Sequence, residues 1–216
     1  MAWRKNTICC ICGKCPATTK DHIPPNGIFP DPKPTNLITV PACDKCNQGS
    51  SLDDEYFRAI IAPAYGNNDL AARLVYENIT RRIRKKPALI QSIINSAERM
   101  DVHSEGGIYL GKLPAIKCDP QRIWTVIDKI VRGLYWHETK EMLGADYCIS
   151  QIVFNPNPPD EAKNSICSLP LKKVGDGKAF SYRYFLDPND SRTSCWLLMF
   201  FDATLFAAFT EPKGCE

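Results

Sequence analysis

The sequence has few of the features that define a membrane, secreted or polycationic protein. Its 216 residues carry a formal net charge of +3, so any nucleic-acid binding would need a local basic face. The most apolar stretch, residues 195–209, is interrupted by Asp202 and is too short to cross a bilayer. No uninterrupted apolar segment typical of a secretory signal follows Met1, and there are no internal repeats. We therefore expect a cytoplasmic protein with no membrane partner.

Cysteine, by contrast, is abundant and unevenly distributed. Of eleven cysteines, six lie within the first 46 residues and the other five are scattered. In a reducing compartment such a set is not a disulfide framework by default. The odd number also leaves at least one cysteine outside any intramolecular pairing. This asymmetry predicts a compact, metal-dependent module that ends near Ile60, where Ala62-Pro63 breaks the pattern.

The early cysteines form CxxC elements. Two such elements together can supply the four thiolates of a tetrahedral structural zinc site. Three such elements are present: Cys9–Cys12, Cys12–Cys15 and Cys43–Cys46. Gly13 directly follows Cys12, and a glycine there lets the backbone amides turn toward the sulfurs. We therefore predict the zinc ligands Cys9, Cys12, Cys43 and Cys46. Replacement of one ligand by Cys10 or Cys15 stays open, as do unmetallated thiols or a redox pair.

Residues between and after these elements carry the groups needed for hydrolytic chemistry. Asp21 offers a carboxylate to a hard cation, and the adjacent His22 offers an imidazole for general-base catalysis. Asn47, which follows Cys46, can supply a second oxygen to the same cation. Oxygen ligands with several retained waters suit magnesium. Alone, an Asp-His pair more commonly makes a surface hydrogen bond.

The order of these motifs resembles the HNH nuclease family. The resembling features are a Cys-x-x-Cys-Gly knuckle, Asp21-His22, a central Asn36 before the hydrophobic residues 37–41, the second CxxC and a terminal Asn47. Asn47 stands where the family name has its second histidine, as in the HNN variant. The resemblance covers about the first sixty residues and implies a ββα-metal fold.

The resemblance also implies a mechanism. His22 would deprotonate the water that attacks the scissile phosphorus, and Asp21 and Asn47 would hold one Mg²⁺ or Mn²⁺. Asn36 would hydrogen-bond across the loop and hold the His22 segment in its working geometry, although it could simply cap a turn after Pro34-Thr35. DNA is the expected substrate, with RNA as the alternative, and the products would carry a 5′ phosphate and a 3′ hydroxyl.

The remainder of the chain predicts an α+β accessory domain whose helices precede its strands. Helical spacing starts at Asp69 and continues toward Ala97 after a break at Pro87, and Asp119-Pro120 caps a helix expected to end near Gly144. Aromatic and β-branched runs predict the later strands. These lie at 147–154, 180–186, 195–201 and 205–209. The predicted domains are residues 1–62, the zinc-stapled HNH module, and residues 63–216.

A basic run is the best candidate for phosphate contacts outside the module. It consists of Arg81, Arg82, Arg84, Lys85 and Lys86. Its alternative interpretation is a solvated helix end whose cations complement the helix dipole. Two further functional hypotheses stay open: a catalytically inactive zinc module that only binds nucleic acid, and a zinc ribbon for protein interactions. Residues 63–216 would supply target choice, regulation or dimerisation, and a homo-oligomer is compatible with this assignment.

Overall fold

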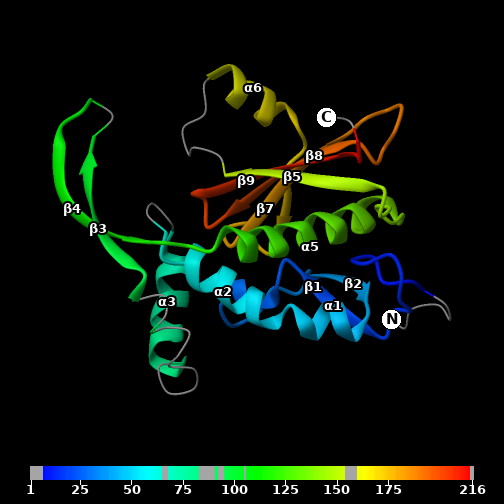
Figure 1. The fold of residues 1–216 in the computed structure, drawn as a ribbon, viewed down its shortest axis with the longest axis horizontal. Helices are drawn as coiled ribbons and strands as arrows, with labels where there is room; N and C mark the ends of the chain where they lie inside the picture. Colours follow the sequence, from blue (N-terminus) through cyan, green and yellow to red (C-terminus); the bar gives the residue numbers. More distant parts are fainter. Residues whose placement is uncertain are drawn as a thin grey trace.

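Residues 7–61 contain a β-hairpin followed by two short helices. The computed structural model describes residues 7–64, 68–82, 91, 95–104, 106–153 and 160–214. The elements of this segment are β1 (Thr19–Ile23), the 3-10 helix η1 (Asn26–Ile28), β2 (Ile38–Ala42), α1 (Asp44–Gly49) and α2 (Ser51–Ile61). Only Ser50 separates α1 from α2, so the two helices continue along one side of the hairpin (Figure 1).

The hairpin register determines which side chains face the core. β1 and β2 are antiparallel, with Asp21 opposite Val40 and His22 opposite Thr39. Because successive strand residues point to opposite faces, Asp21 and Ile23 are buried together whereas His22 lies partly exposed on the other face.

The helix α5 (Pro120–Thr139) is the central element of the molecule. Asp119 caps its N-terminus by accepting a hydrogen bond from the backbone N–H of Gln121, as the sequence predicted. The helix ends before the expected Gly144, because Lys140 takes a left-handed conformation with φ of 62°. One face of α5 is almost wholly buried and contacts α2, β1 and β2.

A five-stranded antiparallel sheet covers the other side of α5 (Figure 1). Its strand order is β5-β9-β8-β7-β6. Trp196, Leu198 and Phe200 of β8 face the main core, and Leu197 and Met199 face a smaller cluster that includes Ile166 of α6. The elements are β5 (Tyr147–Val153), α6 (Asp160–Ser168), β6 (Lys172–Val174), β7 (Phe180–Leu186), β8 (Ser194–Phe200) and β9 (Thr204–Pro212).

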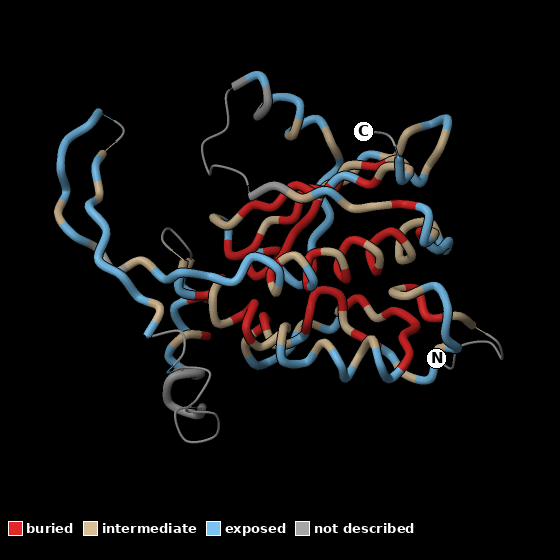
Figure 2. The backbone as a smooth tube through the Cα atoms, viewed as in Figure 1, coloured by how far each residue is buried: buried red, intermediate tan, exposed pale blue. Residues whose placement is uncertain are grey.

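One hydrophobic cluster extends through all three layers. It joins Ile23 and Val40 of the hairpin to Ile127 of α5 and to Phe180 and Trp196 of the sheet. Buried residues accordingly follow α5 and the elements on both sides of it (Figure 2). The α+β class is confirmed in its general form, a mixture of helices and antiparallel sheets. The division at residue 62 stays a prediction, and the packing is continuous across it.

The remaining elements lie at one end of the molecule. They are α3 (Asp69–Arg82), β3 (Ala97–His103) and β4 (Tyr109–Ile116). β3 and β4 form a hairpin that projects away from the three layers (Figure 1). Ala97 therefore begins a strand, where the sequence predicted a helix; much of that expected helix, residues 83–90 and 92–94, lies outside the described residues.

Candidate metal centre and adjoining cleft

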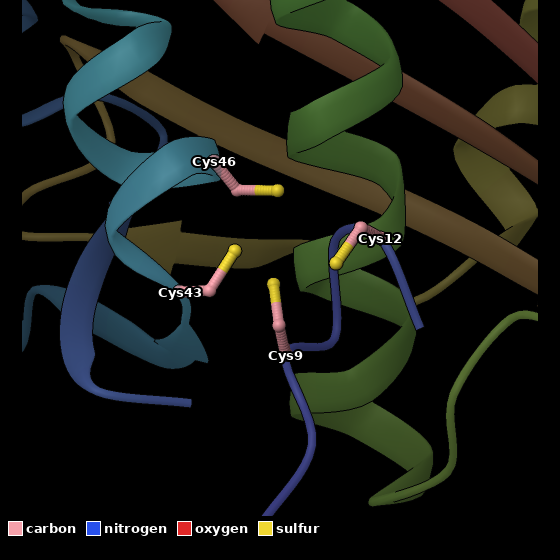
Figure 3. A group of neighbouring side chains, drawn as sticks. All are labelled: Cys9, Cys12, Cys43 and Cys46. Carbon is pink, nitrogen blue, oxygen red and sulfur yellow. The ribbon is translucent and has the colours of Figure 1, made fainter. Parts of the chain in front are cut away.

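Four cysteines meet at the corner where the hairpin joins α1. Cys9 and Cys12 belong to the turn before β1, Cys43 directly precedes α1, and Cys46 lies in its first turns. Their sulfur atoms all lie within 4.8 Å of one another and point toward a common centre (Figure 3). A tetrahedral zinc with Zn–S bonds of about 2.3 Å requires sulfur separations of this order. These cysteines could therefore hold a structural metal such as zinc.

The turn at Gly13 orients backbone donors toward this cluster. Gly13 has a φ of 64°, a conformation that glycine adopts without the strain of a Cβ atom, and its N–H donates to the Cys9 carbonyl. Burial disfavours the Cys12 thiolate, but the backbone N–H groups of Cys15 and Lys14 outweigh this effect and lower the pKa of Cys12 to about 6. Burial raises the pKa of the Cys9 thiol. Metal binding would displace the protons that remain on the thiols.

The neighbouring cysteines occupy different environments. Cys10 is fully buried in the main hydrophobic core, and this burial raises the pKa of its thiol. Cys15 is exposed at the rim of the turn. Among the described His, Cys, Asp and Glu side chains, only the four-cysteine group gathers three or more potential metal ligands.

The corner itself has only a small buried cluster, although the adjacent Cys10 and Ile11 also pack into the main core. Its buried cluster consists of Cys9, Ala42 and Cys43, with Ile11, Cys12 and Cys46 packed against them. So few apolar side chains cannot provide the burial that normally stabilises a fold. A metal bound to the four thiolates would therefore contribute directly to the stability of this corner.

A polar cleft of about 600 Å³ adjoins the corner. Its wall includes Asp21 and His22 of β1 together with Asn47 of α1. The structure thus brings to one cavity the three residues to which the sequence assigned metal binding and base catalysis. Further along the wall, α2 contributes Asp54, Glu55 and Arg58.

Asp21 and Asn47 are held by specific hydrogen bonds. The Asp21 Oδ1 atom accepts the backbone N–H of His22 at 2.8 Å. The Asn47 Nδ2 atom donates to Thr19 Oγ1 at 3.0 Å and to the Lys20 carbonyl at 3.2 Å. Both of these bonds use the amide nitrogen, so the Asn47 Oδ1 atom is not committed to them.

A buried ammonium group lies beside these carboxylates. Lys129 of α5 is only 3% exposed, and its Nζ atom donates to both oxygens of Asp54, at 2.8 and 2.7 Å, and to Ser50 Oγ at 3.0 Å. The Asp21 Oδ2 atom lies 3.4 Å from the same Nζ but accepts no hydrogen bond. Burial raises the pKa of the Asp54 carboxyl, and the Lys129 ammonium opposes this effect.

Arg58 is a second buried cation, and unlike Lys129 it lines the cleft. It is 8% exposed, and its guanidinium Nη1 donates to the Gly27 carbonyl at 3.3 Å. A Cβ atom on Gly27 would lie 2.9 Å from that Nη1 atom, so the absence of a side chain permits the approach. The sequence interpretation had assigned no role to Arg58 or Lys129.

Asn36 lies in a different hollow from the cleft. Its Oδ1 atom accepts the Gly175 N–H at 2.7 Å, and its Nδ2 atom donates to the Lys173 carbonyl at 3.4 Å. These contacts join the loop between β1 and β2 to the C-terminal sheet. The hydrogen bonds described for Asn36 therefore involve residues 173 and 175, and its expected bond across the loop stays a prediction.

The basic run is only partly described. Arg81 and Arg82 form the end of α3, and nothing is described of their side chains. Arg84, Lys85 and Lys86 lie outside the described residues. Their contact with phosphates stays a prediction.

Comparisons with protein-family models, with curated proteins and with solved structures find no match. Within the described part of the chain, no helix has the length and apolar character needed to cross a membrane.

Proposed function

We propose that this protein is a metal-dependent endonuclease of the HNH type that hydrolyses phosphodiester bonds in DNA. The observation that carries the proposal is the shared cleft, whose wall contains Asp21, His22 and Asn47. The order β1, β2, α1 supports it further, because the resembled family has a ββα-metal fold. The four-cysteine cluster lies at the junction of these elements, where zinc would hold the hairpin against α1.

The side chains of the cleft fit a hard divalent cation. The Asp21 Oδ2 atom is buried without a hydrogen bond, and the Asn47 Oδ1 atom is not used by the bonds that fix its amide. Oxygen donors of this kind suit Mg²⁺ or Mn²⁺, which keep several water ligands. Asp21 and Asn47 would hold this cation. When bound, it would stabilise negative charge on the scissile phosphate and the departing 3′ oxygen.

The protein's own groups would perform the proton transfer and the orientation. The side chains of His22 and Asp21 lie on opposite faces of β1. The imidazole of His22 would accept a proton from the attacking water. The carboxylate of Asp21 fixes the backbone of His22 through the bond from its N–H. Asn47 is oriented by Thr19 and Lys20, so both proposed cation ligands are held before substrate binds.

A plasmid-nicking assay in Mg²⁺ or Mn²⁺ tests this function. We expect His22→Ala to lower the cleavage rate by about 10²-fold or more, the range that general-base catalysis contributes. His103→Ala is the matched control, because His103 is exposed on β3, and it should retain the wild-type rate. Nicked product should be resealed by DNA ligase, as expected of 5′ phosphate and 3′ hydroxyl ends.

Two results would oppose the proposal. Equal activity of His22→Ala and wild type would assign the cleavage to another site or a contaminant. Absence of cleavage in all three proteins, with DNA or RNA and with zinc bound, would favour the inactive zinc module that binds nucleic acid or protein.

A further inference from the structure

The charge balance of the cleft depends on a residue from outside the first sixty. Three carboxylates line the cleft, those of Asp21, Asp54 and Glu55. Lys129 reaches two of them from α5, and at 3% exposure its ammonium is removed from solvent. A lysine is almost never buried to this extent unless its charge is paired. The contacts of Lys129 therefore constrain how these carboxylates can be used.

Asp54 and Asp21 are paired with Lys129 to different degrees. Both Asp54 oxygens accept hydrogen bonds from Nζ, at 2.8 and 2.7 Å, and Ser50 Oγ is a third acceptor at 3.0 Å. These three bonds use the three donors of an ammonium group. The Asp21 Oδ2 atom, 3.4 Å away, is attracted by the charge but receives no hydrogen bond.

We infer that Lys129 is a positioning residue that withholds Asp54 from the proposed divalent cation and leaves Asp21 as the carboxylate that binds it. The inference rests on the proposed function. The ammonium engages both Asp54 oxygens and cancels one of the two negative charges closest to it. It thereby limits the attraction of the cleft for divalent cations.

Opposite effects of two substitutions follow from this arrangement. Lys129→Met removes the cation and frees Asp54, so Mn²⁺ should bind about tenfold more tightly, because charges this close interact strongly in a partly buried site. Asp54→Asn leaves the ammonium with Asp21 as its one carboxylate partner among the described residues, so Mn²⁺ should bind about tenfold more weakly. If Lys129 and Asp54 had only a structural role, both substitutions would weaken Mn²⁺ binding.

The experiment measures Mn²⁺ binding to the zinc-loaded, full-length protein without DNA, with free Mn²⁺ quantified by electron paramagnetic resonance. Arg122→Met is the matched control. Arg122 also links α5 to α2, through a 2.7 Å contact from Nε to Asp53 Oδ1, but its partner Asp53 does not line the cleft, whereas the Lys129 partners Asp21 and Asp54 do. It should leave Mn²⁺ affinity unchanged. The double variant Lys129→Met with Asp54→Asn restores the net charge and should bind Mn²⁺ as the wild type does.

The outcomes separate this inference from the proposed function. Unchanged or weaker Mn²⁺ binding by Lys129→Met would overturn the role of Lys129 while leaving a cation-binding cleft in place. Much weaker binding by the double variant than by wild type would make Asp54 itself a ligand and would also overturn it. Wild-type protein that binds no Mn²⁺ would refute the cation site of the proposed function. If Lys129→Met does not fold, Lys129→Gln takes its place, because it also removes the charge, and unchanged or weaker Mn²⁺ binding by this variant again contradicts the inference.

Discussion

At the residue scale, the missing side chain of Gly133 allows α5 to approach β1. A Cβ atom at this position would lie 2.5 Å from Ile23 Cγ1 and 2.9 Å from its Cδ1. Ile23 is buried and directly follows His22, so a displaced Ile23 would also move the imidazole. The small residue is therefore required where the helix and the strand make contact.

Gly133→Ala should destabilise the protein despite the higher helix propensity of alanine. Overpacking of a well-packed core costs about 1–3 kcal/mol. In a chain of this size each kcal/mol lowers the Tm by roughly 2–4 °C, which calorimetry can measure. Gly49→Ala is the control, since a Cβ atom on Gly49 would meet no other atom within 4 Å and the substitution should be neutral or slightly stabilising. Equal Tm changes in the two variants would contradict this packing argument.

Glu138 provides a residue-scale prediction that depends on pH. Burial tends to raise its pKa, but hydrogen bonds from the hydroxyls of Tyr182, at 2.5 Å, and Tyr184, at 2.7 Å, prevail, assisted by Lys172. The pKa of Glu138 therefore lies below its ordinary value of 4.5. A carboxyl with a lowered folded-state pKa stabilises the fold above its unfolded-state pKa, and this contribution is lost as pH falls through the folded-state value.

Glu138→Gln should accordingly lower the stability at pH 7, and the deficit should shrink as the pH falls below 4.5. Urea unfolding curves at a series of pH values give this difference directly. Glu141→Gln, at an exposed position after α5, should show no comparable pH-dependent deficit. A deficit for Glu138→Gln that is constant with pH would argue against the ionised carboxylate as the stabilising form.

At the element scale, we expect the turn before β1 and the start of α1 to depend on a bound metal more than the sheet does. The cysteine corner has only a small apolar cluster of its own, whereas β7, β8 and β9 share the main core. Removal of zinc by a chelator should therefore loosen residues 7–18 and 43–49 first. Hydrogen exchange measured by mass spectrometry should show faster exchange there and unchanged protection of β8. A uniform change in hydrogen exchange along the chain would contradict this order of loosening. Metal analysis should give about one zinc per chain.

Several elements could be predicted because their signals are local. The strand at 180–186 and the N-terminus of α5 at Asp119-Pro120 were predicted at the observed positions. The β3–β4 hairpin was missed, since its residues are mostly exposed and lack the alternation of buried and exposed positions that indicates a strand. The end of α5 was predicted too late. Helices commonly end at a glycine in the left-handed conformation, but here Lys140 adopts that conformation, so the sequence carries no glycine or proline signal at this position.

At the scale of the whole molecule, the candidate site was predictable only where its residues are close in sequence. Asp21, His22 and Asn47 belong to the motif between and beside the CxxC elements, and they line one cleft. Lys129 comes from a helix much later in the chain and lies at the edge of its apolar face, where a lysine is ordinarily solvated. Tertiary packing of α5 against α2 and β1 brings its ammonium to two carboxylates of the cleft wall, and a single sequence does not reveal such long-range packing.

The strand order has a consequence for synthesis of the protein on the ribosome. β9 lies between β5 and β8, although it follows both in the chain. Until residues 204–212 emerge, the nascent β5 and β8 lack a hydrogen-bonding neighbour on that side, and such unpaired strand edges promote aggregation. The four clustered cysteines emerge far earlier, so a metal that they bind would be captured co-translationally. Metal loading would therefore precede completion of the core, and a ribosome that pauses before β9 would carry a metallated but incompletely folded chain.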